Sequence, residues 1–177
     1  AASFTGKNLV SSESCTWLGE HFKVTPAQAK HEIDNLFAAG INHIFYHGIS
    51  YSPKSEKWPG RLFYASVNFG PTNTLFPFFA ELNAYVARTQ AFLQAGRPDN
   101  DLLLYWPVHD AWHRNASAGG SILQRFSVHN AGEWLHGTGF ADSASHMRDN
   151  GWSFDYVSDR MLQKLRYSKG ALTAGGG

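Results

Sequence analysis

Apolar and polar residues alternate at two different spacings near the start of the chain. Residues 7–13 form a short β-leaning run that ends in the carboxylate of Glu13. Thr25 and Pro26 then have the residue types of a helix N-cap and of the first helical position. From Pro26 to about Ala39 the apolar residues recur at helical spacing, which predicts a helix with one apolar stripe: Ala29, Ile33, Leu36 and Phe37.

A second predicted strand follows this helix directly. Residues 41–47 are rich in isoleucine and aromatic side chains and lie between Gly40 and Gly48. A strand, a helix and a strand in this order predict a βα unit in a parallel sheet. Because parallel strands end at the same edge of a sheet, we expect Glu13 and His47 to share one cleft.

A long irregular stretch, residues 49–77, precedes the next helix. It combines aromatic residues with glycine and proline, and a loop of this length in a compact domain is usually functional. The residues alone leave two interpretations open: a binding loop over the strand ends, or a packed connector whose rings fill the core. Apolar residues then follow the helical period from Pro77 to Ala95, and Gly96 ends that predicted helix.

The polar turn at residues 97–100 marks a predicted domain boundary. It precedes a nearly continuous apolar strand, Asp101–Pro107, of the kind that a sheet buries on both faces. The chain is therefore divided into a first region, residues 1–98, and a second region, residues 99–177.

The second region repeats the alternation of strands and helices less clearly. Helices are predicted around residues 132–135 and 142–149, and a strand at residues 154–158. Asp159 is the predicted cap of a short helix over residues 160–165. These elements predict the beginning of a second α/β layer.

Composition narrows the class of partner. Charged residues make up 16% of the chain and the net charge is +1. The sequence contains no basic stripe, which argues against nucleic acid as a partner. No apolar run approaches the ~20 residues of a membrane span. Aromatic residues, at 15%, suit carbohydrate clefts, where ring faces pack on sugar C–H groups, although large cores also use them.

The sequence lacks the motifs of several common kinds of catalytic site. His43 and His47 on one strand would lie ~13 Å apart, too far to share one metal ion. The serines beside Glu13 lack the strained turn of a serine nucleophile. The single cysteine, Cys15, excludes an internal disulfide and has no nucleophile motif around it. Chemistry at the strand-end carboxylate is best supported, and it needs a second acid.

Seven short segments follow one another along the chain in a distinctive order: Ser12–Trp17, Gly40–Gly48, Trp58–Gly60, Asn68–Asn73, Leu82–Arg88, Asp99–Tyr105 and Phe154–Asp159. Each segment alone is only moderately specific for one protein family, whereas their order and spacing together are much more specific. Together they resemble family 106 of the glycoside hydrolases, the α-L-rhamnosidases, over nearly the whole chain.

The resemblance implies an α/β fold made of the last strands and helices of a (β/α)8 barrel, followed by the beginning of a flavodoxin-like α/β domain. Residues 1–98 would end the catalytic barrel, with Glu13 closing its seventh strand and His47 its eighth. Residues 99–177 would begin the next domain, which the chain truncates. Barrel active sites lie at the carboxyl ends of the strands, where these two side chains fall.

The same resemblance implies inverting hydrolysis of terminal α-L-rhamnosides, with Glu13 as the general base that activates water. Trp17, His47, Tyr51 and Trp58 are the predicted sugar contacts. The general acid would lie on an earlier strand outside this chain. The resemblance also implies calcium as a cofactor, but it does not assign the calcium ligands to residues of this chain. We therefore expect the remainder of a parent enzyme to be needed, and the isolated chain to be inactive.

Two alternatives use the same residues differently. A non-catalytic carbohydrate-binding or partner-binding module would use the aromatic loop at residues 49–77 and would not depend on Glu13. A self-contained small α/β protein would require the strand after Asp101 to join one sheet with the strands that end at Glu13 and His47.

Overall fold

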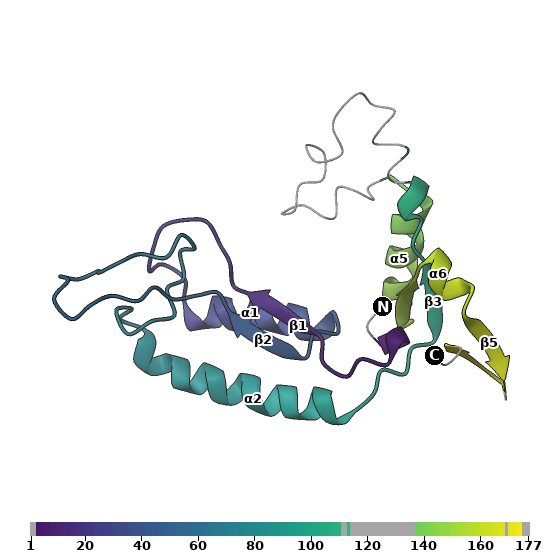
Figure 1. The fold of residues 1–177 in the computed structure, drawn as a ribbon, viewed down its shortest axis with the longest axis horizontal. Helices are drawn as coiled ribbons and strands as arrows, with labels where there is room; N and C mark the ends of the chain where they lie inside the picture. Colours follow the sequence, from purple (N-terminus) through teal and green to yellow (C-terminus); the bar gives the residue numbers. More distant parts are fainter. Residues whose placement is uncertain (1–2, 111–112, 114–136, 169, 175–177) are drawn as a thin grey trace. The chain divides into compact units, whose positions relative to one another are not determined.

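The computed structural model describes residues 3–110, 113, 137–168 and 170–174. The chain divides into two compact units, residues 7–97 and residues 1–6 with 98–177, whose elements are labelled in Figure 1. The helix predicted around residues 132–135 lies outside the described residues. Within the described ranges, no helix is long and apolar enough to cross a membrane.

The unit of residues 7–97 contains the predicted βα arrangement. Strand β1 (Ser11–Ser14) and strand β2 (His43–Tyr46) pair in parallel, and helix α1 (Pro26–Ala38) connects them. The register places Glu13 beside Phe45. Both strands point toward the same end of the unit, where the loops that follow them gather (Figure 1). The prediction of parallel strands is confirmed.

Helix α1 begins and ends where its local sequence signals lie. The Thr25 side chain accepts a hydrogen bond from the Gln28 backbone N–H, and the Gln28 side chain accepts one from the Thr25 N–H, which is a complete capping box. Gly40 follows the helix with φ of +92°, a conformation that L side chains disfavour. The stripe that α1 buries consists of Ala29, Ile33 and Phe37.

The core of this unit lies on one face of the β1–β2 sheet. Helix α2 (Phe79–Ala95), which a short 3-10 turn η2 (Phe76–Phe78) precedes, packs here together with α1. Ile44 and Tyr46 of β2 contact this core. The buried core residues are Cys15, Ala29, Ile33, Phe37, Val67, Phe69, Phe79, Leu82 and Val86.

Two glutamines of α2 bind the backbone of β2 and the residue before it. The Gln90 Oε1 atom accepts a hydrogen bond of 2.6 Å from the Ile44 backbone N–H. The Gln94 Nε2 atom donates one of 2.6 Å to the Asn42 carbonyl oxygen. These two bonds hold α2 alongside β2.

The second unit contains a parallel pair of strands, β3 (Leu102–Tyr105) and β4 (Phe154–Val157), with helix α5 (Gly139–Asp149) between them in the sequence. These strands and this helix agree with the predicted elements. Only Leu104 of β3 is fully buried, because β4 is its one partner among the described strands, whereas the sequence predicted burial on both faces. Leu104 packs with Phe140 and Ala144 of α5.

The end of the second unit differs from the prediction. Helix α6 (Asp159–Leu162) is shorter than the predicted helix, and Ser158 rather than Asp159 is its N-cap. It is short because the chain enters strand β5 (Leu165–Ser168), which forms an antiparallel hairpin with strand β6 (Ala171–Ala174). A short 3-10 turn η1 (Ser3–Thr5) lies at the start of the chain and contacts β4.

The strand pairing overturns one alternative. β3 pairs with β4, and β1 pairs with β2, in two separate sheets. The interpretation as a small α/β protein with all these strands in one sheet is therefore wrong.

Candidate functional site

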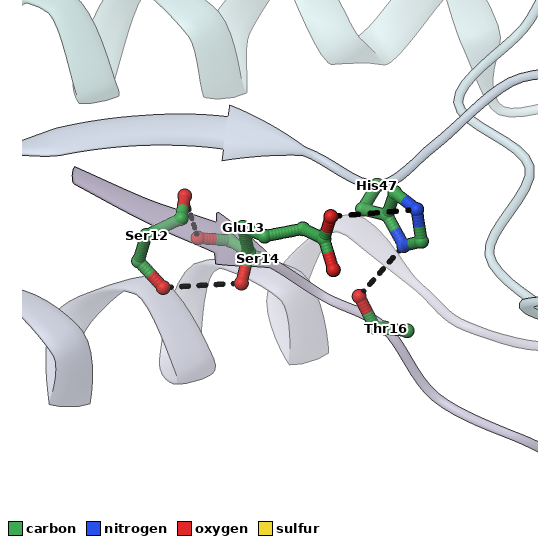
Figure 2. A network of polar contacts seen from close by, with 5 residues as sticks. All are labelled: Ser12, Glu13, Ser14, Thr16 and His47. Atoms are coloured by element: carbon green, nitrogen blue, oxygen red, sulfur yellow. Dashed lines mark hydrogen bonds and ion pairs between the residues drawn. The ribbon is translucent and has the colours of Figure 1, made fainter.

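The ends of β1 and β2 bring the side chains of Glu13 and His47 into contact. The distance from Glu13 Oε1 to His47 Nε2 is 3.6 Å, and Figure 2 shows the two groups facing each other. The Glu13 side chain is 64% exposed, whereas that of His47 is 25% exposed. Parallel pairing thus produces the juxtaposition that the sequence predicted.

Glu13 projects from the sheet face opposite the core. Alternation along β1 turns the neighbouring Ser14 toward the core, where it is buried, and its hydroxyl donates to the Ser12 carbonyl oxygen. Phe45, the cross-strand neighbour of Glu13, is exposed. We call this side the exposed sheet face, and it carries Ser11, Glu13, His43, Phe45 and His47.

Three further side chains fix the His47 ring. Its Nδ1 atom lies 2.9 Å from the Thr16 hydroxyl oxygen. The rings of Phe63 and Tyr64 approach it edge-on, with centroid distances of 4.6 and 5.5 Å. Thr16 reaches this position after Cys15, whose φ of +68° turns the chain at the end of β1.

The loop after β2 is held by two buried asparagines. The Asn73 side chain donates to the carbonyl oxygens of Val67 and Asn68 at 3.0 and 3.1 Å and accepts from the Leu75 N–H. The Asn68 side-chain oxygen accepts from the Phe63 N–H. Buried amides with satisfied partners hold a loop in one conformation. The loop contributes Val67 and Phe69 to the core, as a packed connector would, and its Phe63 and Tyr64 rings contact His47. Binding by this loop stays a prediction.

The other predicted sugar contacts have different partners and exposure. Trp17 is partly buried against the core of its unit. Tyr51 is 80% exposed. Trp58 is exposed too, although its indole N–H donates to the Thr72 carbonyl oxygen and its ring packs on Phe22.

Within the described part of the chain, no hydrogen bond, ion pair or ring contact joins Trp17, Tyr51 or Trp58 to Glu13 or His47. Their contact with sugar stays a prediction. No local sequence pattern identified Thr16, Phe63 or Tyr64 as a site residue. The only signal for the two rings was the aromatic content of the loop, which does not indicate which ring meets His47.

Burial makes Cys15 unsuitable as a catalytic nucleophile. Desolvation by burial, with a smaller contribution from the charge of Glu32, raises the pKa of the Cys15 thiol to about 12. The reactive form of cysteine is the thiolate, so this thiol is inert near neutral pH. Burial likewise raises the pKa of Tyr46 to about 12. The Cys15 thiol and the Tyr46 hydroxyl therefore both stay neutral near neutral pH.

Calcium would need several oxygen ligands. The described residues contain no group of three or more His, Cys, Asp or Glu side chains that could hold a metal ion. The chain's described residues therefore supply no calcium site of that kind, and calcium binding by the parent enzyme stays a prediction.

Two known proteins are similar to this chain. The chain is 30% identical over 107 residues to a "Putative beta-glucuronidase" of Formosa agariphila, and the match covers 59% of this chain and 9% of that protein. Its fold is similar to the rhamnosidase from Novosphingobium sp. PP1Y, with a TM-score of 0.66 and 21% identity. That likeness covers 98% of this chain and 14% of the rhamnosidase chain.

The chain thus spans only a small part of the length of the proteins that it matches. The sequence profile of the alpha-L-rhamnosidases, glycoside hydrolase family 106, matches residues 1–114, which include Glu13, His47 and the whole unit of residues 7–97. On this match, the chain belongs to glycoside hydrolase family 106, the alpha-L-rhamnosidase family.

Proposed function

We propose that this chain forms part of an inverting α-L-rhamnosidase in which Glu13 is the general base. One observation carries the proposal: in a member of this family, the two parallel strand ends place an exposed carboxylate against an ordered imidazole. The carboxylate is accessible to water and substrate, and His47 fixes its position. General bases of glycosidases have this chemical character.

The proposed reaction is a single displacement at the anomeric carbon of a terminal rhamnose. Glu13 accepts a proton from a water molecule as the water oxygen attacks the anomeric carbon. The bond to the leaving-group oxygen breaks on the opposite side, and a general acid donates a proton to that oxygen. We place the general acid on an earlier barrel strand, roughly 6.5–9.5 Å from Glu13, as inversion requires.

In this proposal residues 1–98 end a (β/α)8 barrel, and the exposed sheet face points into the barrel. The arrangement of α1 and α2 on the other face supports this, since barrel helices cover the outside of the strands. Residues 99–177 would begin a flavodoxin-like domain, for which the parallel β3–β4 pair is the support. The parent enzyme supplies the other strands, the general acid and any calcium ligands.

We expect the purified 177-residue chain to release no rhamnose from a chromogenic α-L-rhamnoside, whereas the full-length parent enzyme hydrolyses it. The reason is that the chain lacks the proposed acid and most of the barrel. The assay measures aglycone release by both proteins at equal molarity. Turnover by the 177-residue chain at a rate comparable with the parent enzyme would show that the remainder is not needed.

Hydrolysis of β-glucuronides is the second candidate activity, because a relative of this chain bears the name "Putative beta-glucuronidase". The same assay with a chromogenic β-glucuronide separates the two substrate classes. Release from the glucuronide and not from the rhamnoside would replace the proposed substrate. Binding of rhamnosides by the parent protein without hydrolysis of either substrate would favour the non-catalytic module.

Tyr64 is a proposed sugar contact that the structure adds to the predicted ones. Its ring is 64% exposed, yet it is held against Phe63 at a centroid distance of 4.7 Å and against the His47 ring. An ordered, exposed ring beside the base offers a face for the apolar side of a sugar.

For Tyr64→Ala in the parent enzyme we expect KM for the rhamnoside to rise about 3- to 10-fold with a smaller change in kcat, because an aromatic contact contributes about 1 kcal/mol. Tyr64→Phe, which keeps the ring, should retain the wild-type KM. The matched control is Phe92→Ala, which removes an exposed ring from α2. Equal KM values for Tyr64→Ala and the wild type would remove Tyr64 from the proposed site.

A further inference from the structure

We propose that Thr16 is a positioning residue that keeps a His47 N–H directed at Glu13. This inference rests on the proposed role of Glu13 as general base. Thr16 does not touch Glu13 in the polar network of Figure 2; it contacts the other nitrogen of the ring. Its effect on Glu13 therefore passes through the imidazole.

The two contacts of the ring determine where its proton lies. An ionised carboxylate only accepts hydrogen bonds, so the nitrogen that faces Glu13 is favourable only when it carries a hydrogen. A neutral imidazole has one N–H, which must then be on Nε2. Nδ1 is left as an acceptor, and the Thr16 hydroxyl, 2.9 Å away, is the group that donates to it.

The hydroxyl suits the charged form of His47 equally well. When the ring is protonated, Nδ1 also carries a hydrogen and donates to the Thr16 oxygen, because a hydroxyl both donates and accepts. In both forms the Nε2–H faces Glu13. A valine has nearly the same shape as threonine and offers neither bond, so the ring loses the polar contact that holds its Nδ1 side in place.

The surroundings of His47 contain few other groups that could set its proton. Phe63 and Tyr64 hold the ring edge-on, and among the described residues Tyr64 and Glu13 are the titratable groups in contact with it. His43 lies on the same sheet face, with its Nδ1 atom 3.0 Å from the Ser11 hydroxyl.

Helices α1 and α2 pack on the opposite face. The ionisable side chains that contact the core there are Cys15, Tyr46 and Tyr85. They are separated from His47 by the sheet, so Thr16 is the group placed to control Nδ1.

An N–H that points at Glu13 holds the carboxylate that accepts a proton from water in one orientation. His47 contacts Oε1 of Glu13, so Oε2 is the oxygen that the geometry assigns to the attacking water. Loss of the Thr16 hydroxyl should therefore lower kcat and change KM little, because the displaced group acts on water rather than on the sugar.

The test compares kcat and KM for the wild-type parent enzyme and its Thr16→Val, Thr16→Ala, Thr16→Ser and Ser11→Ala variants. For Thr16→Val and Thr16→Ala we expect kcat to fall about tenfold with little change in KM, because one hydrogen bond that positions the ring is lost. Thr16→Ser keeps a hydroxyl and should restore the wild-type kcat. Ser11→Ala removes the equivalent hydroxyl from His43 and should leave both constants unchanged.

Two results would overturn the inference: kcat values of Thr16→Val and Thr16→Ala equal to that of the wild type, or a loss that lies in KM while kcat is unchanged. A Thr16→Ser enzyme that behaves like Thr16→Val would also overturn it. A Glu13→Gln enzyme measured alongside separates the two claims. If it is inactive while the Thr16 variants behave as wild type, the proposed function stands and the role of Thr16 falls; if it is fully active, both fall.

Discussion

Replacing Glu13 by glutamine in the parent enzyme should lower kcat for an α-L-rhamnoside by about 10²–10⁴-fold, the usual contribution of a general base. Glutamine has nearly the size of glutamate, so the contact with His47 can persist, but a neutral amide cannot accept the proton of the attacking water. KM should change little, because the substituted group acts on water rather than on the sugar. Initial rates with a chromogenic rhamnoside over a range of concentrations measure both constants.

Glu20→Gln is the matched control for this substitution. Glu20 lies in the same unit, its side chain is 77% exposed, and its ion pair is with Lys23, 3.6 Å away on the surface. The control variant should keep the wild-type kcat. Equal activity of Glu13→Gln and Glu20→Gln would remove Glu13 from the catalytic machinery.

Ile33→Ala should destabilise the unit of residues 7–97 by about 2–5 kcal/mol, because the change removes three carbons from a close-packed position. Ile33 is fully buried in α1 and belongs to the core that joins α1, α2 and the loop after β2. Hydrogen exchange of the amides of residues 7–97 in increasing urea measures the free energy of unfolding of this unit separately from the other.

Leu18→Ala in the same unit is the control for lost apolar volume. Leu18 is 72% exposed, so its replacement should change the free energy of unfolding by no more than about 0.5 kcal/mol. If the two variants lost equal stability, Ile33 would not lie in a packed core. The comparison tests the placement of α1 directly.

Local signals in the sequence predicted much of this unit. Thr25 and Pro26 predicted the start of α1, and Gly40 predicted its end. Such signals are local, because helix caps and left-handed backbone conformations depend on residues that are close in sequence. The position of Glu13 next to His47 followed from one further rule, that parallel strands end at one edge.

Other features depend on contacts that local patterns do not determine. The loop brings Phe63 and Tyr64 to His47 through the buried amides of Asn68 and Asn73, and a one-dimensional pattern of aromatic residues cannot show such a meeting. Thr16 reaches His47 because Cys15 adopts a left-handed conformation, which is rare for a residue other than glycine.

The β5–β6 hairpin was not predicted, because the local pattern there was also ambiguous. Its strands are short, and Leu165 continued the apolar spacing of the preceding helix. A short strand that extends such a pattern is easily assigned to the helix.

The most direct test of the central claim is the configuration of the sugar that the parent enzyme releases. Proton NMR spectra recorded during the first minutes of hydrolysis of an α-L-rhamnoside distinguish the two anomers of free rhamnose before they interconvert. A general base at Glu13 predicts β-L-rhamnose as the first product, since water attacks from the face opposite the leaving group. Initial appearance of α-L-rhamnose would contradict the account, because retention requires the carboxylate to act as a nucleophile.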